Sequence, residues 1–159
     1  MILTDEEKNI EKEYEYITKE KDYVKLKDLP RHGNTTTYEH SIRVACLTGK
    51  IAEKMNADVT SAIKVGLLHD LCFVNYYEKN DHPGLYMFYH PVEAVENSKK
   101  YNLSKKEEKA IISHMFPGGR IPTSKIGWAL TIADKIVAVK EKLYGIRKVK
   151  EKAVFANLL

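Results

Sequence analysis

The sequence has few cysteines and no long run of apolar residues. Its 159 residues include 2 cysteines, Cys46 and Cys72, and these do not form a CxxC pair. We therefore expect two reduced thiols packed in the interior rather than a thiolate metal site or a disulfide. The longest apolar runs, such as residues 128–133, are far too short to cross a bilayer, so no membrane partner is expected.

The first residues of the sequence also do not resemble a secretory signal. The first 16 residues, MILTDEEKNIEKEYEY, carry acidic side chains where such a signal needs a basic start and an apolar stretch. The expected compartment is the cytoplasm. The formal net charge is +4, and the basic residues gather in the region 135–152. Aromatic residues are not interleaved with them and no binding motif accompanies them, so we interpret this region as a solvated helix face and predict no specific nucleic-acid partner.

Strand-like alternation and internal repeats are absent, which favours an all-α protein. With 43% hydrophobic and 30% charged residues, the chain is suited to one folded domain spanning 1–159. The core is expected at about 35–143, with a helix in 1–30 packed on it and a basic C-terminal extension at 144–159. We predict a compact bundle of about six or seven helices.

Helical periodicity and capping signals place these helices. The predicted segments are 4–22, 36–55, 59–72, 91–102, 104–114 and 125–143, with loops at 75–90 and 116–122. Thr36 and Ser104 each precede a glutamate by three residues, as in a capping box. Pro91 suits the first position of a helix.

Polar residues interrupt the apolar faces of these helices. Alone, a histidine at a helix end is usually a hydrogen-bonded structural residue, whereas an aspartate in an apolar helix is less easily explained, because the low dielectric demands a partner. Together, inward residues on five helices are hard to explain by packing, since imidazole and carboxylate groups are ligands of divalent metals. The sequence therefore predicts a metal site built from His40, His69, Asp70, His90, His114 and Asp134.

The order of these residues resembles the signature of the HD superfamily of metal-dependent phosphohydrolases. The flanking segments EHSIRVACLTGKIAEKM and AIKVGLLHDLCF are similar to the first two helices of that fold, and LTIADKIVAVKE to its closing helix. The resemblance covers about residues 35–143. It implies a helical bundle of the HD-domain type and a small phosphorylated substrate, such as a nucleotide or another phosphate ester.

The resemblance also implies a dinuclear centre. His40, His69, Asp70 and Asp134 correspond to the ligands of a first metal ion, and Asp70 would bridge to a second ion on His90 and His114. Iron or manganese is favoured over zinc, magnesium, cobalt or nickel, because the ligands are nitrogen and oxygen with no thiolate. The implied reaction is attack of a metal-activated hydroxide on phosphorus.

Departures from the family narrow the choice of subfamily. Alarmone hydrolases carry a Glu-Asp pair soon after the HD dipeptide, whereas residues 71–74 are LCFV. Cyclic-dinucleotide phosphodiesterases carry a Gly-Tyr-Pro triad, and the nearest segment here is PGGR at 117–120. The layout is closer to small dinuclear members such as the symmetric diadenosine tetraphosphate hydrolases.

Three cations are candidates for stabilising a phosphoryl group beside Asp70. Arg43 lies one turn after His40, Lys135 follows Asp134, and Arg120 lies on the loop after His114. Arg43 and Lys135 have the alternative role of ion-pair partners of helix carboxylates. Two other functions also fit the ligand set: a mixed-valent di-iron oxygenase of the same fold, and a non-catalytic metal-binding module. The oligomeric state stays open, including a homodimer.

Overall fold

The computed structural model describes residues 1–31, 34–75 and 84–156, with side chains as far as residue 148. These residues form eight α-helices and two short 3-10 helices, and they contain no strand beyond one isolated bridge between Pro30 and Thr36. The all-α prediction is therefore confirmed. None of the described helices is both long enough and apolar enough to span a membrane.

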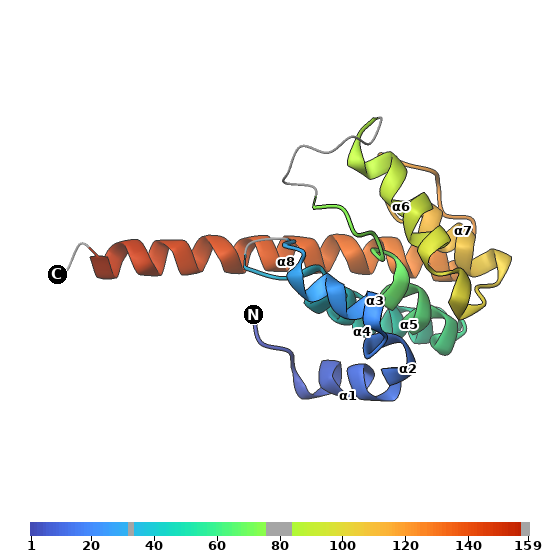
Figure 1. Ribbon diagram of the computed structural model, residues 1–159, viewed down its shortest axis with the longest axis horizontal. Coiled ribbons are helices and arrows are strands. Elements are labelled where there is room, and N and C mark those ends of the chain that lie inside the picture. Colours follow the sequence, from blue (N-terminus) through green and yellow to red (C-terminus); the bar gives the residue numbers. More distant parts are fainter. Residues whose placement is uncertain (32–33, 76–83, 157–159) are drawn as a thin grey trace.

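Three helices form the centre of the bundle (Figure 1). Helix α4 (Thr37–Lys54) packs against both α5 (Val59–Leu68) and α8 (Lys125–Ala156). The predicted capping box at Thr36 is present, and the Asp58 side chain accepts a hydrogen bond from the third residue of α5. Local capping thus fixes where α4 and α5 begin.

A second pair of helices covers the other side of α8. Helix α7 (Lys105–Ser113) packs on α8 and on α6 (Tyr86–Asn97), and the two lie away from the N-terminal helices in Figure 1. The start predicted at Pro91 is wrong, because Pro91 lies inside α6. The additional turn is supported by the ring of Tyr86, which stacks on His90 with centroids 4.4 Å apart. Residues 76–83 of the predicted loop lie outside the described residues.

The N-terminal segment is broken where one helix was predicted. It forms α1 (Asp5–Glu13), α2 (Glu15–Thr18) and α3 (Lys21–Val24), followed by the 3-10 helix η1 (Lys25–Asp28). The break comes at Tyr14, whose ψ of 35° leaves the helical region. These breaks turn Tyr14, Ile17 and Tyr23 toward the core, where each is at most 4% exposed, so the segment packs on the core although it is not a single helix.

Two further helix ends differ from the prediction. Helix α5 stops at Leu68, with His69 as its C-cap, instead of continuing to Cys72. Helix α8 continues to Ala156 instead of stopping near residue 143, so the basic extension is helical, and its red end projects past the rest of the molecule in Figure 1. Cys46 and Cys72 are buried free thiols, as predicted.

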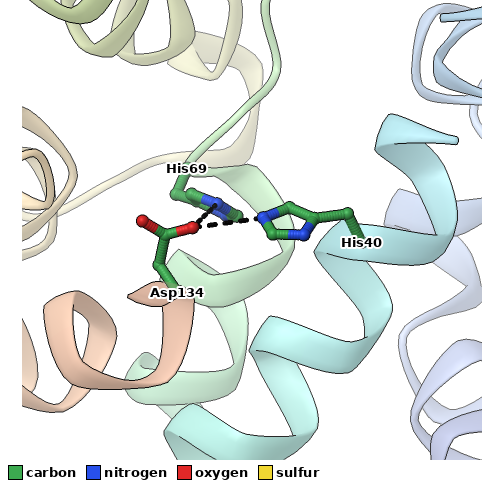
Figure 2. A group of neighbouring side chains, drawn as sticks. All are labelled: His40, His69 and Asp134. Carbon is green, nitrogen blue, oxygen red and sulfur yellow. Dashed lines mark hydrogen bonds and ion pairs between the residues drawn. The ribbon is translucent and has the colours of Figure 1, made fainter. Parts of the chain in front are cut away.

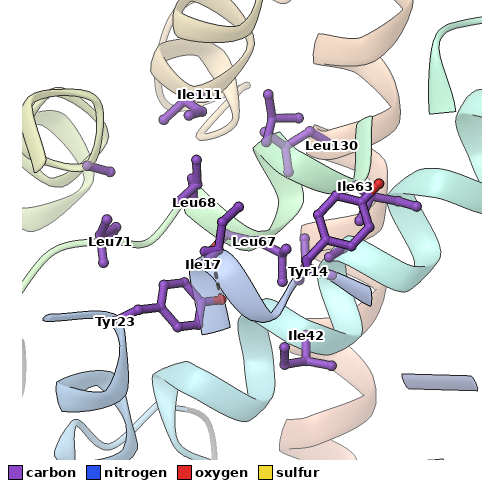
Figure 3. Packing of buried hydrophobic residues seen from close by; sticks show 14 of the residues in the cluster. Tyr14, Ile17, Tyr23, Ile42, Ile63, Leu67, Leu68, Leu71, Ile111 and Leu130 are labelled. Carbon is purple, nitrogen blue, oxygen red and sulfur yellow. Dashed lines mark hydrogen bonds between the residues drawn. The ribbon is translucent and has the colours of Figure 1, made fainter. Parts of the chain in front are cut away.

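The hydrophobic core joins all of these layers (Figure 3). Leu67 and Leu68 at the end of α5 lie between Ile111 of α7 and Tyr23 of α3. The buried hydroxyl of Tyr23 donates to the carbonyl oxygen of Leu67 at 3.0 Å. The core thus holds the end of α5 in place directly before His69, and a fixed backbone there is what a metal ligand needs.

Candidate metal centre

The six predicted ligands meet in the interior of the bundle. Five of them are 0% exposed and Asp134 is 5% exposed. They come from α4, the end of α5 and the residue after it, α6, the end of α7, and α8. Figure 2 shows His40 and His69 facing the Asp134 carboxylate, whose Oδ1 lies 3.2 Å and 3.8 Å from their Nε2 atoms.

The carboxylate of Asp70 lies between two pairs of imidazoles. Its Oδ2 is 3.3 Å from Nε2 of His69 and 3.8 Å from Nε2 of His40. Its Oδ1 is 3.3 Å from Nε2 of His90 and 3.8 Å from Nε2 of His114. Each oxygen therefore faces one pair of ring nitrogens, which is the arrangement needed for a bridging carboxylate.

All four imidazoles are oriented in the same way. Nδ1 of His69, His90 and His114 each donates to a backbone carbonyl in the preceding turn, at 2.7–2.8 Å. Nδ1 of His40 donates instead to Oε2 of Glu141, at 2.8 Å. Because these oxygens accept and Nδ1 must carry the hydrogen, Nε2 is left to face the centre, as in histidine metal ligands.

The centre contains buried polar atoms without a hydrogen-bond partner. In the described part of the chain, nothing donates to Nε2 of His69 or to either carboxylate oxygen of Asp70. In addition, Nε2 of His90 lies 3.0 Å from Nε2 of His114, so two acceptor atoms face each other in the neutral rings. Buried nitrogen and oxygen atoms that lack a hydrogen-bond partner are costly unless a cation binds them. The nitrogen and oxygen set therefore fits divalent metal ions.

The electrostatics of the centre favour positive charge. Burial opposes ionisation of Asp70, but Arg31 and His69 outweigh it and hold the pKa of Asp70 well below its usual value. For Asp134, burial is outweighed by the hydrogen bond with His40 and by the imidazole of His69, 3.8 Å away, which again lower the carboxyl pKa. Both aspartates are therefore negatively charged at neutral pH.

The histidines respond to the same charges in different ways. Burial disfavours protonation of His69, but the two aspartates outweigh it and raise its pKa to about 9. Burial, followed by repulsion from His90 and His69, lowers the pKa of His114 well below the usual histidine value. Metal binding through Nε2 of His69 would therefore displace a proton from that ring.

A pocket of about 290 Å³ opens beside the centre. It is lined by two of the ligands, by Tyr86, Met115 and Ala138, and by three cations: Arg31, Lys135 and Lys142. Nζ of Lys135 is 2.8 Å from Asp134 Oδ2 and 3.1 Å from the carbonyl oxygen of His114. The structure therefore places Lys135 at the pocket, as predicted for a group that contacts phosphate, and also in its alternative role as an ion-pair partner.

The other two predicted cations lie elsewhere. Arg43 is buried with Nη1 2.8 Å from Glu141 Oε1, so it lies behind His40 rather than in the pocket. Arg120 is exposed and lines a different hollow, of about 530 Å³, with Phe88 and Gly118 among its neighbours.

Two residues make contacts at the centre that the sequence did not predict. Glu141 accepts from His40 and pairs with Arg43, and its position seven residues after Asp134 on the same helix face could have indicated this. Arg31 lies 2.5 Å through Nη2 from Asp70 Oδ2, an ion pair outside hydrogen-bond geometry, and donates through Nη1 to Tyr86. No spacing signal links Arg31 to the HD pair, because it precedes α4 in an irregular segment.

A helical bundle that gathers buried histidines and aspartates around one point defines a class of helical metal-centre proteins. Within that class, the sequence model of the HD domain matches residues 37–139. The chain belongs to the HD domain family, which confirms the resemblance seen in its motifs.

Known proteins with related sequences include two ribonucleases. The chain is 37% identical over 99 residues to Ribonuclease Y of Mycoplasma capricolum, covering 62% of this chain and 18% of that protein. It is 34% identical over 121 residues to Ribonuclease Y of Staphylococcus epidermidis, covering 72% and 21%. The Glycine--tRNA ligase beta subunit of Pseudoalteromonas atlantica is 35% identical over 103 residues, covering 64% and 14%. The chain thus spans about a fifth or less of the length of these relatives.

Proposed function

We propose that this protein is a metal-dependent phosphohydrolase that hydrolyses a nucleotide or another small phosphate ester. The observation that carries the proposal is the position of Asp70 between two pairs of inward Nε2 atoms, next to a pocket lined by cations. HD domain membership supports the same class of reaction, because the superfamily consists of metal-dependent phosphohydrolases.

The donor set divides into two groups around Asp70. One divalent ion would be held by His40, His69, Asp70 and Asp134, and a second by Asp70, His90 and His114, with iron or manganese as our proposed occupants. When bound, such ions supply Lewis acidity, which lowers the pKa of water and neutralises charge on a phosphoryl group.

The protein's own residues supply binding and orientation. The Lys135 ammonium lies at the rim of the centre. There it would donate to a phosphoryl oxygen and form an ion pair with it. Lys142, two turns further along α8, adds positive charge to the same pocket. Glu141 and the three backbone carbonyls keep the imidazoles from rotating.

A substrate panel on metal-loaded protein tests the proposal. The panel contains phosphomonoesters, generic phosphodiesters, dinucleoside polyphosphates and, because two relatives are named ribonucleases, a single-stranded RNA oligonucleotide. We expect hydrolysis of at least one class with Mn²⁺ or Fe²⁺ bound. Asp70→Asn should abolish it, because the neutral amide loses the charge that both sites share.

The matched control is Asp58→Asn, the same substitution at the N-cap of α5. Asparagine caps a helix as well as aspartate does, so this variant should keep full activity. Oxygen uptake is followed in parallel, since the same ligands suit a mixed-valent di-iron oxygenase. Full metal loading without hydrolysis of any substrate, or oxygen uptake in its place, would contradict the proposal.

A further inference from the structure

Helix α8 carries a row of exposed apolar side chains. The row, which we call the α8 stripe, consists of Ile132 (41% exposed), Ile136 (39%), Val139 (56%), Leu143 (61%) and Ile146 (54%). Successive members are separated alternately by four and three residues. This is the spacing of the a and d positions in a coiled coil, where such residues face a second helix.

The α8 stripe lies opposite the side by which α8 joins the bundle. Leu130, Ala133 and Val137 point into the core and are at most 5% exposed. A surface helix of a globular domain needs one apolar face, whereas α8 has two. The core therefore accounts for one apolar face of α8, whereas the α8 stripe stays exposed in the described part of the chain.

The shape of the α8 stripe suits a helix better than a lipid surface. With 3.6 residues per turn, its five members fall within an arc of about 80° around the helix axis. A row confined to a and d positions is the narrow seam of a coiled coil, and a helix that lies in a membrane interface presents a broader apolar face. Helix α8 also continues beyond the other helices in Figure 1.

Among the side chains of α8 that the structure describes, those charged and beside the α8 stripe are all positive. Lys140 and Arg147 flank it on one side, and Lys135 and Lys142 flank it on the other. The acidic side chains of α8 up to residue 148, Asp134 and Glu141, are buried in the bundle. Two copies pairing through this seam would bring lysine and arginine against lysine and arginine, which disfavours a homodimer.

We propose that the α8 stripe is a docking seam for an amphipathic helix of a partner, with apolar residues at a and d and acidic residues beside them. Glutamate or aspartate in the partner would pair with the flanking cations, and the apolar rows would exclude water. Lys135 and Lys142 also line the pocket beside the metal centre, so the docked helix would lie along one rim of that pocket. The proposal does not depend on the proposed enzymatic activity.

Designed peptides test the seam on the 159-residue chain. One three-heptad helical peptide carries leucine at a and d with glutamate at e and g, and a second carries lysine at e and g. We expect the acidic peptide to bind, measured by fluorescence anisotropy, and its affinity to fall as salt rises. The basic peptide should bind at least about tenfold more weakly, because its charges repel those of α8.

Variants separate the seam from other surfaces. Leu143→Asn should weaken binding of the acidic peptide about tenfold or more. The control is Val92→Asn on α6, which is 50% exposed and should leave binding unchanged. The double variant Lys140→Glu and Arg147→Glu reverses the charge on one side of the α8 stripe. It should bind the basic peptide more tightly than the acidic one.

Three results would overturn the proposal. One is the absence of binding to the acidic peptide. Another is self-association in sedimentation experiments that Leu143→Asn abolishes, which would make a second copy the occupant. The third is binding to vesicles containing anionic lipid, sensitive to Leu143→Asn, in place of peptide binding. Circular dichroism of each variant checks that the helices are intact.

Discussion

At the scale of single residues, the centre depends on what holds Nδ1 of each histidine. Three of the four rings donate to a carbonyl of their own backbone turn, so their orientation follows from local helix geometry. His40 differs, because its acceptor is the buried carboxylate of Glu141, which reaches it from α8 and also pairs with Arg43. The charge on Glu141 makes the His40 ring a stronger electron donor, as in carboxylate–histidine–metal arrangements.

Glu141→Gln therefore tests a residue that never contacts the metal ion. The amide can still accept from His40, but it loses the negative charge and leaves the Arg43 guanidinium with a weaker partner. We expect the apparent affinity for Mn²⁺ to fall by about 10–100-fold, with the fold retained. Competition with a fluorescent chelator measures the affinity.

The control for this prediction is Glu53→Gln, an exposed position near the end of α4. It should leave Mn²⁺ affinity unchanged. If Glu141→Gln binds Mn²⁺ as tightly as the unmodified protein does, the orienting role of Glu141 is wrong.

At the scale of elements, the close approach of α4 and α5 positions His40 against His69. The two helices approach so closely at Gly66 that a Cβ there would lie 2.5 Å from Cα and 2.9 Å from N of Ala45. Gly66 is also the residue whose carbonyl holds His69. Only glycine lets α5 come this near, so one missing side chain sets the spacing of two ligands.

Gly66→Ala should consequently disturb both the fold and the centre. Alanine favours helix by about 1 kcal/mol over glycine, but the backbone of α4 has to move to make room. We expect a net loss of about 1–3 kcal/mol in the free energy of unfolding, measured by urea denaturation. Mn²⁺ affinity should fall as well, since His69 is displaced from His40.

Gly49→Ala is the comparison on the neighbouring helix. Its added Cβ meets the Cγ1 atom of Ile63 at 2.8 Å, a side-chain atom that can change rotamer. It should cost less stability and leave metal affinity intact. Equal effects of the two substitutions would contradict the role assigned to the Gly66 contact.

At the scale of the whole molecule, the ligands tie the bundle together. They come from α4, α5 and the residue after it, α6, α7 and α8, so the centre links segments from residue 40 to residue 134. Among the described residues, this interior contains buried imidazole and carboxylate atoms without a hydrogen-bond partner, which a bound cation would pair. Metal ions that bind only the folded chain should therefore stabilise it strongly.

Removal of metal should lower the melting temperature. At a free Mn²⁺ concentration about a hundredfold above its dissociation constant, the stabilisation is about 2.7 kcal/mol per site, or roughly 5–10 °C. Differential scanning calorimetry of chelator-treated and Mn²⁺-loaded protein measures the difference. Asp70→Asn should show no such difference. If the melting temperature of the unmodified protein is the same with and without Mn²⁺, the assignment of the centre is wrong.

The sequence by itself determined the order of the main helices, several of their caps and the six inward side chains. These features follow from local rules: periodicity places residues on a face, and side chains such as Thr36 and Asp58 satisfy free amides at a helix start. The polar residues stood out because apolar faces tolerate buried charge only with a partner.

Tertiary contacts decided the rest. The stack of Tyr86 on His90 extends α6 ahead of Pro91, and packing of Tyr14 and Ile17 breaks the predicted N-terminal helix. Arg31 and Glu141 join the centre, whereas Arg43 and Arg120 lie outside its pocket, because long side chains reach partners that only the packed helices define. Spacing along the chain fixes which face a residue occupies, but the partner across the interface depends on how the helices cross, and that is a property of the folded chain alone.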